Sequence, residues 1–310
     1  MRRKIIRQGN NSYTITLPID WIRDEELKEG SEVEIEREDS HLNIFLTKDA
    51  RRIQNKISLD LKDYNNRTII NILNQTYRKG YDIITLNYHN NDQLLCIKEN
   101  IKELFGFEIV DIKNNECILQ NIAEPSAEKF DVILRKVFLI IKEGSNEILN
   151  DLKDNKSDKS KKLDEEKKTF DNYTNLCRRL IIRDRIGGTK DSYSLLIIVS
   201  RLSLIYHAYY YMYKAIANKK ISLNKETQNL FSETNKMFEL FESAFYNKDF
   251  EKANKIGILK DKLLYSNLYS LLKKSNGEEN IVLYHVGEII RLIHLASINL
   301  FGFVKGEENS

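Results

Sequence analysis

The 310-residue sequence predicts a multidomain α+β protein with an N-terminal swapped-hairpin β domain, a small α/β middle domain and an all-α C-terminal half. Three observations predict this order. Apolar and polar residues alternate over residues 1–48, strand-like and helix-like segments follow one another over residues 50–124, and residues 126–303 show helical spacing throughout. These three ranges are the predicted domains, and the chain is long enough to hold them.

The N-terminal domain begins with a strand pattern. In SYTITL, residues 12–17, apolar and polar side chains alternate, and the preceding Gly9 is the first of three turn-forming residues. Pro18 stands at the strand end and suits the first turn of a helix, which is predicted over about residues 19–28. Gly30 is placed to end that helix in the left-handed conformation.

The rest of this domain is predicted to be a hairpin of SEVEIER and LNIFL, with Val33 and Ile35 facing inward. About 48 residues with few large apolar side chains cannot bury enough surface to fold alone. A second copy with interleaved strands would solve this problem. We therefore expect a homodimer.

The middle domain is predicted to have βαβαββ order. RRIQNKISLDL and DIITLNY have strand patterns, and the helix between them, RTIINILNQTYRKGY, places Ile69, Ile72, Leu73 and Thr76 on one face. A second helix, LLCIKENIKELFG, precedes two more strands, FEIVDIK and ECILQNI. Parallel pairing within this unit is assumed.

The C-terminal half is predicted to be six helices separated by polar or glycine-containing breaks. Their approximate ranges are 127–152, 163–186, 190–218, 222–247, 249–274 and 279–303. Six helices of similar length divide into two three-helix bundles, which suggests an internal duplication.

Charge points to a local binding site. The net charge of +3 argues against a nucleic-acid binder that is basic over its whole surface. The first acid is Asp20, whereas four bases stand near the N-terminus. The predicted DNA-binding residues are Arg2, Arg3, Lys4, Arg7, Asn10, Asn11, Ser12 and Tyr13.

These residue types suit a nucleic acid because Arg and Lys neutralise phosphates and release counterions, and amide and hydroxyl groups can bond phosphates or base edges. The competing interpretation is that the charges are merely solvated. The many acids between Asp20 and Asp39 must lie away from bound DNA.

Other classes of protein find little support. Cys96, Cys117 and Cys177 are widely spaced and odd in number, which predicts reduced thiols and a cytoplasmic protein. No uninterrupted apolar run approaches the roughly 18 residues of a membrane span, and no membrane insertion is expected. Common nucleotide-binding and hydrolase motifs are absent, so we expect neither an enzyme nor a bound cofactor.

The first 46 residues resemble a known family. RKIIRQGNNSYTITLPIDWIRDEELKEGSEVEIER is similar to the swapped-hairpin domain of the AbrB/SpoVT/MazE family in its basic first strand, its G-x-x-S-Y-x-I-x-LP segment and its L-K-x-G-S-x-V-E-I return. The resemblance implies a strand-exchanged dimer whose first strands and adjoining loops face DNA.

The helical half resembles the PhoU family of phosphate-signalling proteins, most clearly in FDNYTNLCRRLI, residues 170–181, and AFYNKDFEKANKI, residues 244–256. The whole order resembles archaeal proteins that join both domain types. This implies a link to phosphate uptake and a partner such as a phosphate-transport ATPase or a sensor kinase. The paired carboxylates of that family are eroded here, because Lys167 precedes Asp171 by four residues, and we predict no metal.

The resulting expectation is a transcriptional regulator with DNA as its partner and the helical half as sensor or relay. The alternative is a protein-interaction adaptor or antitoxin-like module that uses the swapped hairpin for dimerisation.

Overall fold

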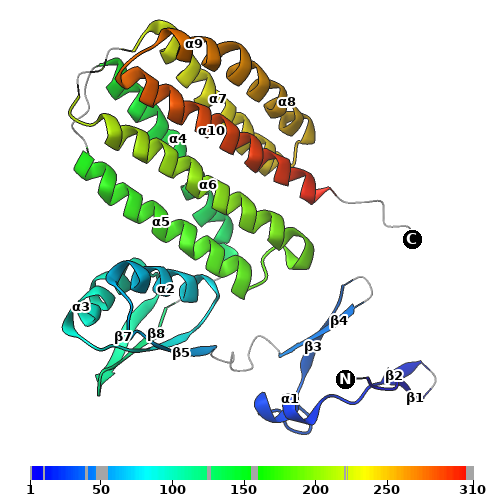
Figure 1. The fold of residues 1–310 in the computed structure, drawn as a ribbon. Coiled ribbons are helices and arrows are strands. Elements are labelled where there is room, and N and C mark those ends of the chain that lie inside the picture. The colour runs from blue at the N-terminus through cyan, green and yellow to red at the C-terminus, as the bar shows by residue number, and fades with distance from the viewer. Residues whose placement is uncertain are drawn as a thin grey trace. The chain divides into compact units, whose positions relative to one another are not determined.

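The computed structural model describes residues 2–9, 11–38, 41–46, 55–123, 127–154, 160–219, 221 and 223–304 (Figure 1). The chain divides into two compact units, Met1–Asn55 and Lys56–Ser310. The second unit holds both the predicted middle domain and the predicted helical half. The protein is thus mixed α+β, with a small N-terminal β region and a helical C-terminal region, whereas the three-domain division stays a prediction.

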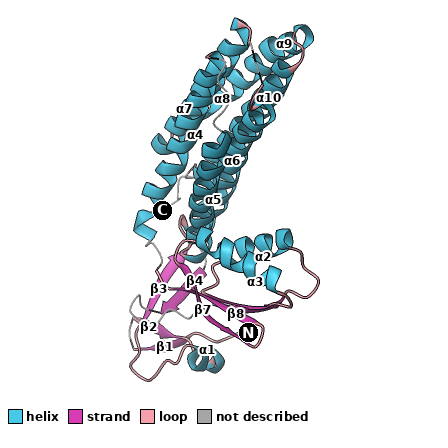
Figure 2. Cartoon of the chain, turned by 90° about the vertical axis from the view of Figure 1, so that its left-hand side faces the viewer, coloured by secondary structure: helices cyan, strands magenta, loops and turns pink. Residues whose placement is uncertain are grey.

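The first unit consists of two hairpins and a short helix (Figure 2). Strands β1 (Ile6–Gln8) and β2 (Ser12–Thr14) pair antiparallel, as do β3 (Val33–Glu38) and β4 (His41–Leu46). Helix α1 (Ile19–Asp24) starts directly after Pro18, whose φ of −60° suits a helix start. The predicted order of strand, helix and returning hairpin is confirmed.

Three predictions for this unit are wrong. Helix α1 ends at Asp24 rather than near residue 28, because Glu26 takes a left-handed φ of 51° and turns the chain there. Gly30 has a φ of 87°, but it belongs to the following turn and does not cap α1. Ile35 is 60% exposed instead of facing a core, since the two-stranded β3–β4 sheet has no second layer within the unit.

The second unit begins with a four-stranded sheet in the order β5–β6–β8–β7. Its elements are β5 (Lys56–Asp60), α2 (Asn66–Arg78), β6 (Ile83–Asn87), α3 (Asn91–Asn100), the 3₁₀ turn η1 (Ile101–Glu103), β7 (Phe107–Lys113) and β8 (Glu116–Asn121). Strands β5 and β6 are parallel and the other pairs are antiparallel. The predicted βαβαββ order is confirmed, with parallel pairing at its first two strands.

Helices α2 and α3 cover one face of this sheet (Figure 1). Each helix is capped by an asparagine side chain: Asn65 accepts a hydrogen bond from the Thr68 amide and Asn90 accepts one from the Gln93 amide. The predicted inner face of α2 is buried at Ile69, Leu73 and Thr76 and half-buried at Ile72. The sheet and its helices enclose a core of their own.

The remaining chain forms the helices of the C-terminal region (Figure 1). They are η2 (Ala127–Lys129), α4 (Phe130–Lys153), α5 (Ser160–Arg183), α6 (Gly188–Ile216), α7 (Lys225–Asn247), α8 (Phe250–Asp261), the π-helix η3 (Lys262–Leu268), α9 (Tyr269–Lys274), α10 (Glu278–Ile298) and η4 (Asn299–Phe303). The six predicted helices match this series closely. The fifth is interrupted by the π-helical segment, which the sequence analysis did not predict.

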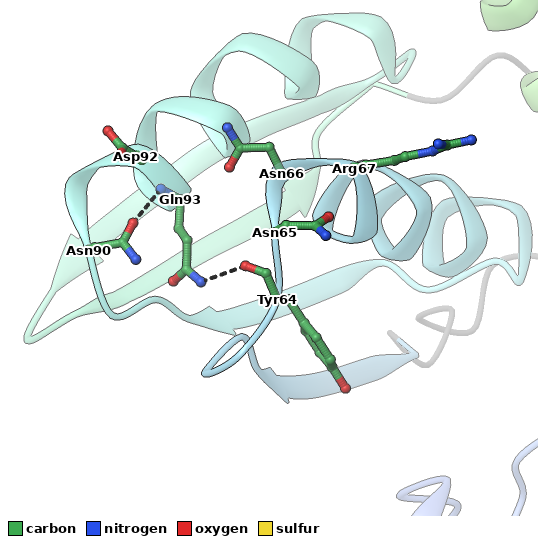
Figure 3. Close-up of a pocket in the computed structure, with 7 residues that line it drawn as sticks. All are labelled: Tyr64, Asn65, Asn66, Arg67, Asn90, Asp92 and Gln93. Carbon is green, nitrogen blue, oxygen red and sulfur yellow. Dashed lines mark hydrogen bonds between the residues drawn. The ribbon is translucent and has the colours of Figure 1, made fainter.

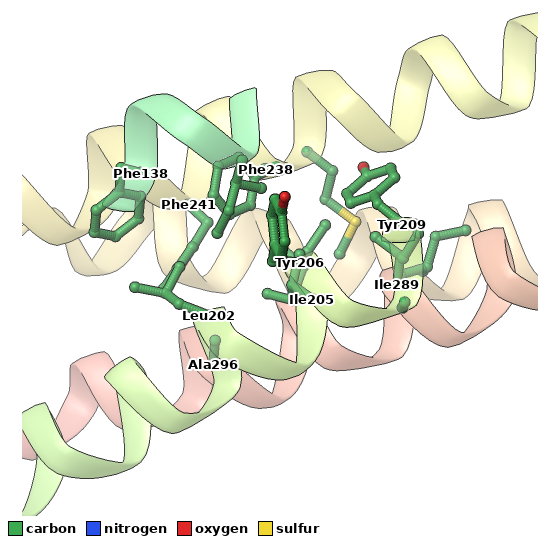
Figure 4. Close-up of a cluster of buried hydrophobic side chains, with 14 of the residues drawn as sticks. Phe138, Leu202, Ile205, Tyr206, Tyr209, Phe238, Phe241, Ile289 and Ala296 are labelled. Atoms are coloured by element: carbon green, nitrogen blue, oxygen red, sulfur yellow. The ribbon is translucent and has the colours of Figure 1, made fainter. Parts of the chain in front are cut away.

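These helices share one continuous hydrophobic core. Phe138 of α4 contacts Phe238 and Phe241 of α7, while Leu202 and Ile205 of α6 lie in the same cluster (Figure 4). Helices α4, α5 and α6 pack on one another, and so do α7, α8 and α10, but α6 also packs along α10 and α4 along α7. Two separate three-helix bundles of the PhoU type therefore remain a prediction.

The tyrosine-rich stretch of α6 contributes to this core. Tyr209 and Tyr213 are buried and donate hydrogen bonds to Asn235 and Asp151, at 2.9 and 3.1 Å. Tyr210 is half-buried and bonds Asp164, whereas Tyr211 is 54% exposed. Most of the stretch is thus accounted for by packing within the helical region.

The α/β part is attached to the helical part through α2 and α5, which pack together. Arg179 of α5 is fully buried and donates hydrogen bonds to the carbonyls of Tyr77 and Tyr81, at 2.9 and 2.8 Å. It also pairs with Asp82 at 3.2 Å, and Arg183 pairs with the same carboxylate at 2.9 Å. A buried ionic network therefore fixes the sheet region on the bundle.

Two helical stretches, Asp191–Ile216 and Glu278–Phe303, are long and apolar enough by length and composition to cross a membrane. The sequence analysis found no uninterrupted apolar run of that length, because both stretches contain charged residues. In each, 56% of the most apolar window is buried inside the protein. This is the behaviour of core helices, and both stretches belong to the shared core described above.

Candidate nucleic-acid interface

The β1–β2 hairpin sets the geometry of the predicted DNA-binding residues. Arg7 lies opposite Tyr13 and Gln8 lies opposite Ser12. Gly9 in the connecting turn has a φ of 74°, a left-handed conformation that glycine adopts without strain. The Ser12 hydroxyl hydrogen-bonds the Gln8 carbonyl across the turn and so fixes the turn from inside the hairpin.

The basic residues lie along this hairpin and its N-terminal extension. Arg2, Arg3 and Lys4 precede β1, and all three are exposed. Arg7 is exposed on β1, and its Nε donates to the Gly9 carbonyl at 3.3 Å, which holds its guanidinium beside the turn. The four bases therefore lie exposed on β1 and on the segment that precedes it.

The polar residues of the turn extend this strand. Asn11, Ser12 and Tyr13 are all exposed, with Tyr13 at 67%. Asn10, the remaining predicted contact, lies outside the described residues. The hairpin thus presents guanidinium, amide and phenol groups together, and these groups can bond phosphate oxygens and base edges.

The acids of this unit lie on other elements. Asp20 and Asp24 belong to α1, and Glu34 belongs to β3. No described acid lies on the β1–β2 hairpin, so the local charge of the hairpin is purely positive. Such a strand attracts a polyanion despite the nearly neutral chain.

The first unit also exposes many apolar side chains. Where side-chain exposure is described in this unit, no residue is buried, and Trp21 is half-buried rather than in a core. Ile5 is 71% exposed, Leu42 is 64% exposed, and Ile35 lies opposite Ile44 on the same face of β3–β4. The first unit thus exposes a large apolar surface for its size.

A separate polar pocket lies in the second unit, where the parallel strands β5 and β6 end and helices α2 and α3 begin (Figure 3). Its lining residues are Tyr64, Asn65, Asn66, Arg67, Asn90, Asp92 and Gln93. The buried Gln93 amide is already fully used, because it donates to the Leu61 and Tyr64 carbonyls and accepts from the His89 amide. The side chains that line this pocket therefore do not indicate a reaction or a ligand.

The carboxylate that best matches a PhoU-type ligand is held by a lysine and a histidine instead of by a second acid. Asp171 accepts hydrogen bonds from Lys167 at 2.6 Å and from His207 at 2.8 Å. Burial raises the pKa of Asp171, but these two bonds outweigh it and the pKa lies below its ordinary value. Within the described part of the chain, no three acids, cysteines or histidines gather around a common point.

The histidines on the helices differ in their hydrogen bonds. His207 bonds Asp171, and His285 bonds Glu288 at 3.2 Å. The buried Nδ1 of His294 has no hydrogen-bond partner among the described residues. Burial lowers the pKa of His294, and the nearby charge of Lys260 lowers it further.

Comparison with known proteins gives one match. The family model described as "Antidote-toxin recognition MazE, bacterial antitoxin" matches residues 6–53, which include the basic hairpin, α1 and β3–β4. No curated protein and no solved structure matches the chain. Residues 6–53 are thus similar to a MazE-type antitoxin domain, which fits a DNA-binding or antitoxin-type function.

Proposed function

We propose that the protein is a DNA-binding transcriptional regulator that grips DNA through the β1–β2 hairpin. Arg2, Arg3, Lys4 and Arg7 neutralise phosphates, and Asn10, Asn11, Ser12 and Tyr13 add hydrogen bonds. The observation that carries this proposal is the match to the MazE-type family over residues 6–53, within which Arg7 begins the exposed polar hairpin. Phosphate contacts supply affinity, while contacts to base edges supply sequence preference.

The proposed active form is a strand-exchanged homodimer. Support comes from the exposed apolar residues of the first unit, such as Ile35 and Leu42, which a second copy would cover. Two hairpins would double the basic footprint, and a two-fold dimer would place them on related half-sites.

The helical region would serve as sensor or relay for this DNA-binding end. The resemblance to PhoU proteins supports a link to phosphate uptake, with a phosphate-transport ATPase or a sensor kinase as partner. In this proposal the protein works in the cytoplasm and catalyses no reaction. The rigid attachment of the sheet region to α5 through Arg179 would let a change in the bundle move the sheet region with it.

The second candidate function is an antitoxin-like or adaptor module. The matching family is described by antidote–toxin recognition, and exposed apolar side chains such as Ile5 and Ile19 would suit a protein partner. In that case the hairpin serves dimerisation and masking of the partner, and its bases contribute little DNA affinity.

DNA affinity measured across a salt series separates the two functions. We expect the full chain to bind duplex DNA with an affinity that falls steeply as salt rises, measured by fluorescence anisotropy. A variant with Arg2, Arg3, Lys4 and Arg7 changed to alanine should bind weakly, with each lost phosphate contact flattening the log–log slope by about 0.9.

The matched control changes four exposed lysines of the second unit to alanine: Lys62, Lys98, Lys102 and Lys129. It removes the same charge and should leave the salt slope unchanged. If the two variants show the same salt slope, the hairpin bases do not bind DNA. In that case, or if the unaltered protein binds no DNA while remaining dimeric, the antitoxin-like or adaptor function replaces DNA binding as the proposed function.

A further inference from the structure

Two arginines meet at the junction between the α/β part and the helical part of the second unit. Arg78 is the last residue of α2, and Arg178 lies in the last two turns of α5. The Nε of Arg78 donates to the Asn175 side-chain oxygen at 2.8 Å, and Nη1 of Arg178 donates to the same oxygen at 3.4 Å. Two positive groups from different parts of the unit therefore share one neutral acceptor.

The Asn175 side chain is held in place beside Arg78 and Arg178. It is 4% exposed, and its Nδ2 donates to the Asn74 side-chain oxygen at 3.0 Å, which turns Oδ1 toward the arginines. The arginines themselves are half-buried. The acceptor is fixed by the packing of α2 on α5, so the convergence does not depend on a mobile loop.

The charge of this pair is only partly compensated by the protein. Neither arginine makes an ion pair with a carboxylate in the described part of the chain. Asp171 is the acid whose field reaches both, but its two oxygens are bonded to Lys167 and His207. Arg78, Arg178 and Lys167 thus face a single ionised carboxylate.

The pKa values of the two arginines reflect the same excess of positive charge. The pKa of Arg178 is lowered to about 10, mainly by burial and also by the charge of Arg78, while Asp171 opposes both effects. Burial likewise lowers the pKa of Arg78. Half-buried cations without a full counter-charge are costly, and proteins compensate such groups with an anion.

We propose that Arg78 and Arg178 form a binding site for a doubly charged tetrahedral oxyanion of the phosphate class. Guanidinium groups bind such anions through paired N–H donors, and two of them match two negative charges. The anion would bridge α2 and α5, so its binding would tighten the joint between the sheet region and the bundle. The site lies outside residues 6–53, and it stands whether or not the hairpin binds DNA.

Thermal unfolding of the full chain, without DNA, tests this site. We expect inorganic phosphate, titrated at constant ionic strength with chloride, to raise the Tm saturably, because a ligand of the folded state stabilises it by mass action. Arg78→Gln or Arg178→Gln should weaken the apparent phosphate affinity at least about tenfold, since each removes charged hydrogen bonds. The double variant should show no phosphate response.

Three comparisons make the result decisive. Arg67→Gln removes an exposed arginine from the same helix and should leave the phosphate response intact. Arg178→Lys keeps the charge but loses the planar fork, so it should fold and bind phosphate more weakly. Without phosphate, Arg178→Gln should not lower the Tm, because it removes a cation that is only partly compensated, whereas loss of a purely structural arginine would lower it.

The proposal is overturned if chloride and phosphate change the Tm equally, or if the double variant keeps the response. It is also overturned if Arg67→Gln abolishes the response, because the anion would then lie in the pocket of Figure 3. O-phosphoserine distinguishes the source of the ligand. Protection by inorganic phosphate without protection by O-phosphoserine assigns a free ion, and equal protection assigns the phosphoryl group of a larger molecule.

Discussion

At the scale of single residues, buried charged side chains hold parts of the second unit together. Arg179 has no exposed side-chain surface, and it stacks near the rings of Tyr77 and Phe107 while bonding two carbonyls and Asp82. A sequence analysis cannot predict this role, because Arg179 and its partners lie about 100 positions apart and their proximity exists only once α5 packs on α2. The same reason hides Arg78 and Arg178, whose shared acceptor links two helices.

We expect Arg179→Met to lower the free energy of unfolding by about 3–5 kcal/mol, because it breaks a buried ion pair and removes donors from two carbonyls. Urea unfolding of the full chain, followed by circular dichroism, measures this change. Lys113→Met is the control, since Lys113 pairs with Asp111 on an exposed strand and should leave the unfolding midpoint unchanged. A loss for Arg179→Met as small as that of the control would contradict the structural role of the buried network.

At the scale of elements, most of the fold follows from local pattern. The helical spacing and polar breaks of residues 126–303 predict helices within a few residues of those observed, and the alternation in the middle domain predicts all four of its strands. The π-helix Lys262–Leu268 escapes prediction because its sequence has ordinary helical spacing. Leu268, its last residue, packs closely against Gly287 of α10.

Two helix glycines should respond in opposite ways to substitution by alanine. A methyl group at Gly257 of α8 would meet His294 at an ordinary 3.6 Å, so Gly257→Ala should raise the free energy of unfolding by about 0.5–1 kcal/mol. A methyl group at Gly287 would lie 2.5 Å from the Leu268 Cδ2 atom, so Gly287→Ala should lower it by about 1–3 kcal/mol through overpacking.

Urea unfolding of both variants beside the unaltered protein checks this pair, and each variant serves as the other's control for helix propensity. Equal stabilisation by the two substitutions would mean that α10 does not press on the π-helix.

At the scale of the whole molecule, the two units differ in how complete they are. The second unit has two extensive cores, one under the sheet and one through the bundle. The first has no buried side chain where exposure is described. The sequence predicts this contrast from the scarcity of large apolar residues before residue 48, and it predicts the exposed basic residues near the N-terminus. It also places Ile35 inward, whereas Ile35 is 60% exposed in the first unit.

The last prediction concerns the exposed apolar face of β3–β4. Sedimentation equilibrium of the full chain should give twice the mass of one chain, because a second copy would bring a matching apolar face to Ile35 and Leu42, which share a face of β3–β4. Replacing both with aspartate should yield a monomer, since like charges would then face each other across the interface. Glu34→Gln, on the opposite face of β3, should leave the dimer intact.

The aspartate variant should also bind DNA more weakly than the unaltered protein. Two hairpins can no longer bind one duplex together when the two chains of the dimer separate. A variant that becomes monomeric yet keeps full DNA affinity would show that each hairpin acts alone. An unaltered protein that sediments as a monomer would show that the exposed apolar face serves a different partner, and the antitoxin-like function would then account best for residues 6–53.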